Sequence, residues 1–290
     1  LDGQSLVRVK QASYQLGLRY DHFDPLVETP EVEAALRDDT ILVSVMLANN
    51  ETGALQPIRE LAKVCRKHKV PLHSDAAQAV GKIPVDVKRT GVDMLSMSGH
   101  KIHAPKGVGA LYIRKGTRFA PFMIGGHQEH GRRGGTENVA SIVGLGKASE
   151  LAAEHFVEQM PRIAKIRDRL EKELLARIPR AMVNGTTHQR LPNTTSISFE
   201  YVEGESILLM MDTLGICASS GSACTSGSLE PSHVLRAMGV PFTAAHGSIR
   251  FSLSVFNSED EVDYIVSNLP PLIANLRKMS PFWNQSEQET

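Results

Sequence analysis

The stretch Thr40–Asp75 reads TILVSVMLANNETGALQPIRELAKVCRKHKVPLHSD, and it decides the fold. It opens with a continuous apolar and β-branched run, Thr40–Ala48, which is typical of a buried strand. Pro57–His68 has a proline at its start, apolar residues at helical spacing and basic residues in its last turn, so it predicts a helix. Val70–His73 is a second short strand. Strand, helix and strand at this spacing predict an α/β unit with a mostly parallel sheet.

Two further strands follow along the chain, Met94–Met97 and Val108–Ile113. The first of them runs into the segment Ser98-Gly99-His100-Lys101. Ligands of parallel sheets bind at the carboxyl ends of the strands. The polar residues that follow the strands are therefore candidate site residues.

From about Ala140 the pattern changes to longer helices and a few strands. The expected helices are Ala140–His155, Pro161–Ile178, Gly204–Leu214, Pro231–Met238 and Glu259–Lys278, and the expected strands are Thr195–Phe199 and Ser248–Leu253. We expect a domain boundary near residue 150, with residues 1–150 forming a large α/β domain. Residues 151–290 are expected to form a smaller α+β domain with a Ser- and Gly-rich loop at Ala218–Ser228.

Composition excludes several classes of protein. Among 290 residues, 32 Lys and Arg balance 32 Asp and Glu, so no global charge favours nucleic acid or an anionic membrane. No apolar run is long enough to span a bilayer, and Leu1–Tyr20 lacks the apolar core of a signal peptide. Three cysteines, none in a CxxC pair, argue against a disulfide framework or a cysteine zinc site. A reducing compartment, the cytoplasm, is expected.

Lys101 and Asp75 follow neighbouring strands of the expected sheet. A lysine beside a strand end can form a Schiff base, and a carboxylate can keep the ring nitrogen of pyridoxal 5'-phosphate (PLP) protonated. Each residue alone also has a plainer interpretation. Lys101 would be a solvated surface lysine, and Asp75 the N-cap of a helix that begins near Ala76. Gln78 is either exposed or within reach of the phenolic oxygen of the cofactor.

Two loops offer further polar groups. Asn50 follows the first strand in ANNETG, where it either only forms a turn or also binds a cofactor or a substrate carboxylate. The loop Gly125–Thr136, GGHQEHGRRGGT, has backbone donors and a terminal hydroxyl that suit a phosphate. Its two histidines and one glutamate match no zinc-helix spacing, so a metal site is not expected there.

Cys224 lies in SSGSACTSG, among polar and small residues, which favours an exposed nucleophile on a flexible segment. Cys65 on a helix and Cys217 on a strand have apolar neighbours, and both are interpreted as structural. Arg250 interrupts the strand Ser248–Leu253 with a charge. It is either an edge-strand arginine or a bidentate clamp for the carboxylate of an amino acid.

Six motifs occur in order: ANNETG, HSDAAQAVGK, SGHKIHAPKGVGALY, GGHQEHGRRGGTEN, SGSACTSGSLEPSHVL and RFSLS. Over residues 30–283 this set resembles the cysteine desulfurases of the class V aminotransferase fold, in particular the nitrogen-fixation (NifS-type) branch. The resemblance implies the α/β fold of PLP-dependent transferases, which is aspartate aminotransferase-like. That fold has a large domain with a mostly parallel sheet and a smaller C-terminal α+β domain.

The resemblance also implies a role for each candidate residue. The cofactor PLP would be held by Lys101 through a Schiff base, by Asp75 at the ring nitrogen, by Gln78 at the phenolic oxygen, by Asn50, and by Ser98 and His100 at the phosphate. Thr136 resembles the threonine that reaches the phosphate of the neighbouring subunit, which implies a homodimer with shared sites. Arg250 and Asn50 would bind the substrate carboxylate, and Cys224 would form a persulfide.

The implied activity is removal of sulfur from L-cysteine, which gives L-alanine and a persulfide on Cys224. The implied acceptor is an iron–sulfur scaffold protein that serves nitrogenase assembly, and Cys224 is a candidate iron–sulfur ligand through its persulfide. A selenocysteine lyase shares this fold and chemistry, whereas an ordinary aminotransferase has no use for Cys224. A truncated chain that only binds partners is the non-enzymatic alternative.

Residues 1–25 do not match the family pattern that precedes the first strand. That part of the family supplies a Gly/Thr phosphate loop and a histidine that stacks on the PLP ring. We therefore expect an N-terminally truncated chain or a disrupted start, with consequences for cofactor affinity and activity.

Overall fold

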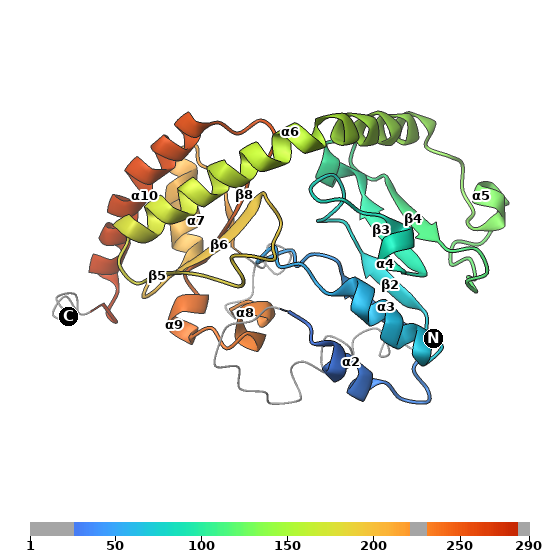
Figure 1. The fold of residues 1–290 in the computed structure, drawn as a ribbon. Helices are drawn as coiled ribbons and strands as arrows, with labels where there is room; N and C mark the ends of the chain where they lie inside the picture. The colour runs from blue at the N-terminus through green and yellow to red at the C-terminus, as the bar shows by residue number, and fades with distance from the viewer. Residues whose placement is uncertain (1–25, 221–230, 284–290) are drawn as a thin grey trace. The chain divides into compact units, whose positions relative to one another are not determined.

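The computed structural model describes residues 26–220 and 231–283 (Figure 1). The chain divides into two compact units. Unit 1 contains Val27–Leu47 and Gln56–Val157, and unit 2 contains Ala48–Leu55 and the described residues from Glu158 onward. The units differ from the expected ranges 1–150 and 151–290 chiefly because Ala48–Leu55 groups with unit 2.

Unit 1 is built on a four-stranded sheet in the order β1-β2-β3-β4. The strands are β1 (Val43–Met46), β2 (Leu72–Asp75), β3 (Met94–Ser98) and β4 (Gly109–Ile113). β1, β2 and β3 are parallel, whereas β4 is antiparallel to β3. The short connection from β3 to β4 explains the reversal, because a parallel crossover needs about a dozen residues or more. The expected α/β class with a mostly parallel sheet is confirmed.

The helices of unit 1 are mostly short. They are α2 (Thr29–Ala35), α3 (Ile58–Lys67), α4 (Val87–Thr90), the 3-10 turn η1 (Gly99–Ile102) and α5 (Gln128–Gly131). α3 buries Ile58, Leu61 and Cys65 on one face, at the spacing of helical turns. Burial and the nearby charge of Asp93 raise the pKa of the Cys65 thiol to about 11. Such a thiol is inert, as expected of a structural cysteine.

The imidazole of His73 ties the parallel strands together. Its Nδ1 lies 2.8 Å from Ser44 Oγ on β1, and its Nε2 lies 3.1 Å from Ser96 Oγ on β3. Burial lowers the pKa of His73, against a smaller opposing effect of the Asp75 charge. The strand that ends at Asp75 is therefore held in register on both sides by a neutral imidazole.

Unit 2 contains an antiparallel sheet in the order β5-β6-β8-β7. The strands are β5 (Ala181–Val183), β6 (Thr194–Phe199), β7 (Ser219–Ser220) and β8 (Ser248–Ser252), and the helices are α7 (Gly204–Thr213), α8 (His233–Ala237), α9 (Phe242–Ala245) and α10 (Glu259–Met279). One apolar core joins Leu170, Ile197, Phe199, Met211 and Ile273, so side chains from the sheet and three long helices share it. The expected α+β character of this part of the chain is confirmed.

The expectation of two helices, Ala140–His155 and Pro161–Ile178, is wrong. The structure has one helix, α6 (Val139–Arg177), with Pro161 inside it (Figure 1). An internal proline costs about 3 kcal/mol, because it removes a hydrogen bond and crowds the preceding turn. Immediately after it, however, four apolar side chains on one face are almost completely buried: Ile163, Ile166, Leu170 and Leu174. Each contributes about 1.5–3 kcal/mol, which outweighs the break.

A buried ion pair joins α6 to the segment that enters β6. Arg190 donates to Glu171 through two nitrogens, at 2.6 and 3.0 Å, and Thr195 Oγ1 donates to the same carboxylate at 2.6 Å. Burial alone would raise the pKa of Glu171, but the hydrogen bonds and charges of its partners, chiefly Arg190, lower it below its ordinary value. Glu171 is therefore a carboxylate in the folded protein.

Among the described residues, none of the helices has both the length and the apolar character to cross a membrane.

Candidate active site

The carboxyl ends of β2 and β3 bring two of the candidate residues to one edge of the sheet. Asp75 is the last residue of β2 and pairs with Ser96 of β3. The backbone amide of Ala76 donates to the carbonyl of Ser96 at 2.9 Å, so the two chains leave the sheet together. Beyond Ser96, β3 ends at Ser98 and continues into the turn η1, which carries Lys101.

The turn that carries Lys101 is built around Gly99. A Cβ on Gly99 would lie 2.9 Å from the carbonyl oxygen of Val108 and 3.1 Å from Ala104, so a larger residue does not fit. The Gly99 amide donates to the Val108 carbonyl, and the Gly99 carbonyl accepts from the Ala104 amide. Lys101 is half-buried in this turn, and His100 is exposed. The turn therefore gives Lys101 a fixed backbone and leaves its side chain accessible.

Asp75 and Gln78 lie on a turn that directly follows β2. Asp75 Oδ1 accepts from the amide of Ala77 at 2.8 Å. The amides of Ala79 and Val80 donate to the carbonyl of Ala76, but the segment does not continue into a helix. Asp75 thus caps a turn, and the helix near Ala76 that belongs to its plainer interpretation is absent. Both Asp75 and Gln78 are half-buried at the same end of the sheet as Lys101.

Sequence reasoning missed Lys82 at the end of this turn. Its Nζ donates to the carbonyl oxygen of Gln78 at 3.1 Å. Burial and then the charge of Lys101 lower the pKa of Lys82 to about 8. Its position four residues after Gln78, and last in the motif HSDAAQAVGK, was the available signal.

In unit 2, Asn50 is held by Arg250. Asn49 Oδ1 accepts from the amides of Glu51 and Thr52, at 2.8 and 3.0 Å, and this folds the segment into a tight turn. Arg250 Nη1 donates to the carbonyl of Asn50 at 2.6 Å. The two predicted substrate-binding residues of this unit are therefore in direct contact.

Arg250 is not an edge-strand arginine. It lies on β8, which is paired with β6 on one side and β7 on the other. Its partners across these strands are Ser196 and Ser219. Its guanidinium is half-buried on this interior strand.

The same turn is held a second time through Glu51. Glu51 is 2% exposed, and Ser232 Oγ donates to its Oε2 at 2.5 Å. Ser232 is also the N-cap of α8, where its Oγ accepts from the amides of Val234 and Leu235. Residues about 180 positions apart in sequence thus fix the backbone around Asn50.

Three further candidates are placed differently from one another. Thr136 is exposed in the loop before α6, and its role toward a neighbouring subunit stays a prediction. Cys224 lies outside the described residues. Cys217, expected as a structural cysteine on a strand, is exposed and precedes β7, so that expectation is wrong.

The described residues contain no group of three or more His, Cys, Asp or Glu side chains that could hold a metal ion.

Comparison with known proteins decides the family. The model of the aminotransferase class-V family matches residues 6–265. The chain belongs to the class-V aminotransferase family. It is 56% identical over 270 residues to a cysteine desulfurase of Trichormus azollae, and the matched region covers 91% of this chain and 68% of that protein. It is 56% identical over 249 residues to the cysteine desulfurase NifS of Azotobacter vinelandii, and the matched region covers 86% of this chain and 62% of that protein.

A solved class-V structure is also similar. The chain aligns with the NifS-like protein from Rickettsia africae ESF-5 at a TM-score of 0.79 and 35% identity, over 87% of this chain and 68% of that one. These findings confirm the resemblance to the NifS-type branch. The chain spans roughly two thirds of the length of the relatives that it matches.

PLP is the cofactor of the class-V family, and the donor set of unit 1 fits it. Asp75 offers a carboxylate for the ring nitrogen, Gln78 an amide for the phenolic oxygen, and Lys101 an amine for the aldehyde. Ser98 and His100 offer a hydroxyl and an imidazole for the phosphate. All five residues lie at or just after the carboxyl ends of β2 and β3, where α/β sheets bind their ligands.

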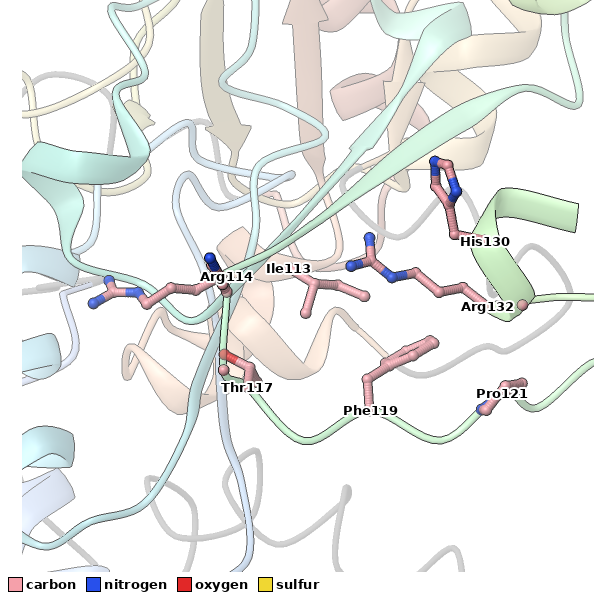
Figure 2. Close-up of a pocket in the computed structure, with 10 residues that line it drawn as sticks. Ile113, Arg114, Thr117, Phe119, Pro121, His130 and Arg132 are labelled. Atoms are coloured by element: carbon pink, nitrogen blue, oxygen red, sulfur yellow. The ribbon is translucent and has the colours of Figure 1, made fainter.

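Unit 1 of this class-V chain also contains a cavity of about 390 Å³ away from these residues. Figure 2 shows it between the end of β4, the following loop with Phe119, and the segment His130–Arg132. Asp75, Gln78 and Lys101 do not line it, whereas His130, Gly131 and Arg132 of the loop Gly125–Thr136 do.

Proposed function

We propose that this chain is a PLP-dependent cysteine desulfurase that takes sulfur from L-cysteine and releases L-alanine. The single observation that carries the proposal is that Asp75 ends β2 and Lys101 follows the end of the adjacent parallel strand β3 in a class-V chain. The names of the relatives, cysteine desulfurase and NifS, give the reaction.

The residues of unit 1 hold the cofactor and move one proton. When bound, PLP supplies an electron sink for negative charge at the substrate Cα. Lys101 would anchor the cofactor, and its free Nζ would take the proton from Cα. Asp75 would keep the ring nitrogen protonated, which strengthens that sink. Gln78 would orient the ring, and Ser98 and His100 would bind the phosphate.

Arg250 and Asn50 are proposed to bind the carboxylate of L-cysteine. A guanidinium presents several N–H donors in a planar fork that matches a carboxylate. The hydrogen bond from Nη1 to the Asn50 carbonyl holds Arg250 in one orientation, so less rotamer entropy is lost when substrate binds.

Cys224 is proposed to take the sulfur. Its thiolate attacks the sulfur of L-cysteine, so a sulfur–sulfur bond forms while the Cβ–sulfur bond breaks. The electron pair stays with the substrate carbon, which gains a proton and leaves as L-alanine. Cys224 loses one proton and the substrate carbon gains one, while the sulfur of L-cysteine becomes the outer sulfur of the persulfide. The reaction therefore needs no external oxidant.

The persulfide then passes to an acceptor, which we propose to be an iron–sulfur scaffold protein that serves nitrogenase assembly. Cys224 can act as an iron–sulfur ligand through the persulfide. Thr136 is proposed to reach the phosphate of a second copy, so that a homodimer shares its sites. A reducing cytoplasm, expected from the small number of cysteines, keeps the thiol available.

The test compares Cys224→Ser with Cys217→Ser, because Cys217 is an exposed cysteine of the same unit. The chain is incubated with PLP, L-cysteine and a thiol reductant, and alanine and sulfide are measured. Only Cys224→Ser should lose both products, while both variants keep the PLP absorbance. Borohydride should fix PLP on Lys101 in the parent chain. Alanine from L-selenocysteine but not from L-cysteine would replace the proposal with a selenocysteine lyase.

A further inference from the structure

Lys82 closes the turn that carries Gln78. The turn leaves β2 at Asp75, and the amides of Lys82 and Ile83 both donate to the carbonyl of Ala79. The side chain of Lys82 then reaches back so that Nζ donates to the Gln78 carbonyl at 3.1 Å. This hydrogen bond closes the backbone between Gln78 and Lys82 and so holds Gln78 in place.

The same turn packs directly against the turn of Lys101. Gly81 has a φ of +75°, and a Cβ on it would lie 2.7 Å from Ile102 Cγ2. Ile102 is the residue after Lys101 and is buried in a small apolar cluster with Ala104 and Ala148. Whatever fixes the Gly81–Lys82 backbone therefore also supports the backbone beside Lys101.

The environment of Lys82 explains its charge state. Burial is the larger cause of its lowered pKa, and the positive charge of Lys101 is the second. Next to Lys82, Gly81 approaches Ile102 of η1 and Ala152 of α6. The other titratable groups on these elements and on the preceding strand are His73 and Asp75 of β2, His100 and His103 in and after η1, and Lys147, Glu150, Glu154 and His155 in the nearby part of α6. Among the described residues, no carboxylate forms an ion pair with Lys82, and its Nζ donates to the Gln78 carbonyl.

We propose that Lys82 is a positioning residue for the cofactor, which holds the turn of Gln78 against the turn of Lys101. This inference rests on the proposed function, since it assigns Lys82 a part in the same site. Lys82 touches neither substrate nor reacting atoms in the proposal, and it acts only through Gln78 and Lys101. A charged donor strengthens such a bond roughly twofold over a neutral one. The hydrogen bond from Lys82 to the Gln78 carbonyl should therefore weaken as Lys82 loses its proton.

The test uses Lys82→Met and Lys82→Arg, with Lys63→Met as the control because Lys63 is an exposed lysine on α3 of the same unit. Two quantities are measured. Amide hydrogen exchange of residues 76–83 is followed in the chain without added PLP. The dissociation constant of PLP is followed by visible absorption at pH values on both sides of about 8.

Lys82→Met should speed exchange in the turn and weaken PLP binding, each by about tenfold, the scale of one hydrogen bond from a charged donor. The parent chain is compared with Lys82→Arg at each pH, because formation of the Schiff base has its own pH dependence in both chains. Relative to Lys82→Arg, whose side chain keeps its charge, the parent chain should bind PLP less tightly as the pH rises through about 8.

Unchanged exchange in Lys82→Met would overturn the inference whether or not PLP binds. Faster exchange with unaltered PLP affinity would also overturn it, because Lys82 would then only stabilise a turn. A parent chain that takes up no PLP on Lys101 would instead refute the proposed function. The difference in exchange rates of residues 76–83 between the parent and Lys82→Met would then still show whether Lys82 stabilises the turn.

Discussion

Gly81→Ala tests how the backbone beside Lys101 is held. Gly81 adopts a left-handed φ of +75°, which costs an L-residue about 1–2 kcal/mol. The new Cβ would also lie 2.7 Å from Ile102 Cγ2, and overpacking of this kind costs about 1–3 kcal/mol. The expected loss is therefore about 2–5 kcal/mol in the free energy of unfolding of unit 1.

Two matched variants separate these contributions. Gly107 has a φ of +86° and nothing within 4 Å of the position of a Cβ, so Gly107→Ala should lose only the backbone part, about 1–2 kcal/mol. Adding Ile102→Leu to Gly81→Ala moves the branch methyl away from Cβ at nearly constant volume. The double variant should recover about 1–3 kcal/mol of the packing part.

Urea unfolding followed by circular dichroism measures the loss, and borohydride fixation of PLP onto Lys101 reports the effect on the site. Equal losses in Gly81→Ala and Gly107→Ala would refute the reasoning about the Ile102 contact. So would a double variant that is no more stable than Gly81→Ala.

Three further predictions concern unit 2 and the cysteines. Glu171→Gln breaks a buried ion pair and should lower the free energy of unfolding by about 3–5 kcal/mol, measured by urea unfolding at neutral pH. Because the folded pKa of Glu171 is lowered, its contribution is present above the ordinary carboxyl pKa and is lost as the pH falls through the folded value; an equally steep acid dependence in Glu171→Gln would contradict this. Arg250→Lys should raise the KM for L-cysteine by roughly 10–100-fold with a smaller change in kcat, and an unchanged KM would exclude Arg250 from carboxylate binding. A thiol reagent at pH 8 should label exposed Cys217 quickly and buried Cys65 only after unfolding, and peptide mass spectrometry after timed labelling checks the order.

The sequence predicted the features that depend on local pattern. Apolar runs located β1, β2 and β3, and the polar residues after them placed Asp75 and Lys101 at one edge of the sheet. This works because parallel strands with helical crossovers leave their carboxyl ends side by side.

Features that depend on long-range packing were not predictable in the same way. The sequence does not show that four buried side chains after Pro161 keep α6 continuous, nor that Cys217 stays exposed beside apolar neighbours. The contact of Lys82 with Gln78 depends on a turn that no periodicity marks. The interior position of Arg250 depends on β7, a strand of two residues.

The segment Ala48–Leu55 also has a consequence for how the protein is made. Although this segment is synthesised early, Gly53 accepts a backbone hydrogen bond from Leu191, and Asn50 accepts one from Arg250, which lies 200 residues away. On the ribosome, the hydrogen bonds from Leu191 and Arg250 to this turn can form only after those residues have been synthesised, and such distant loop closures slow folding. A polypeptide that began at Glu158 would lack Asn50 and Gly53, so unit 2 is complete only when its later residues pack with Ala48–Leu55.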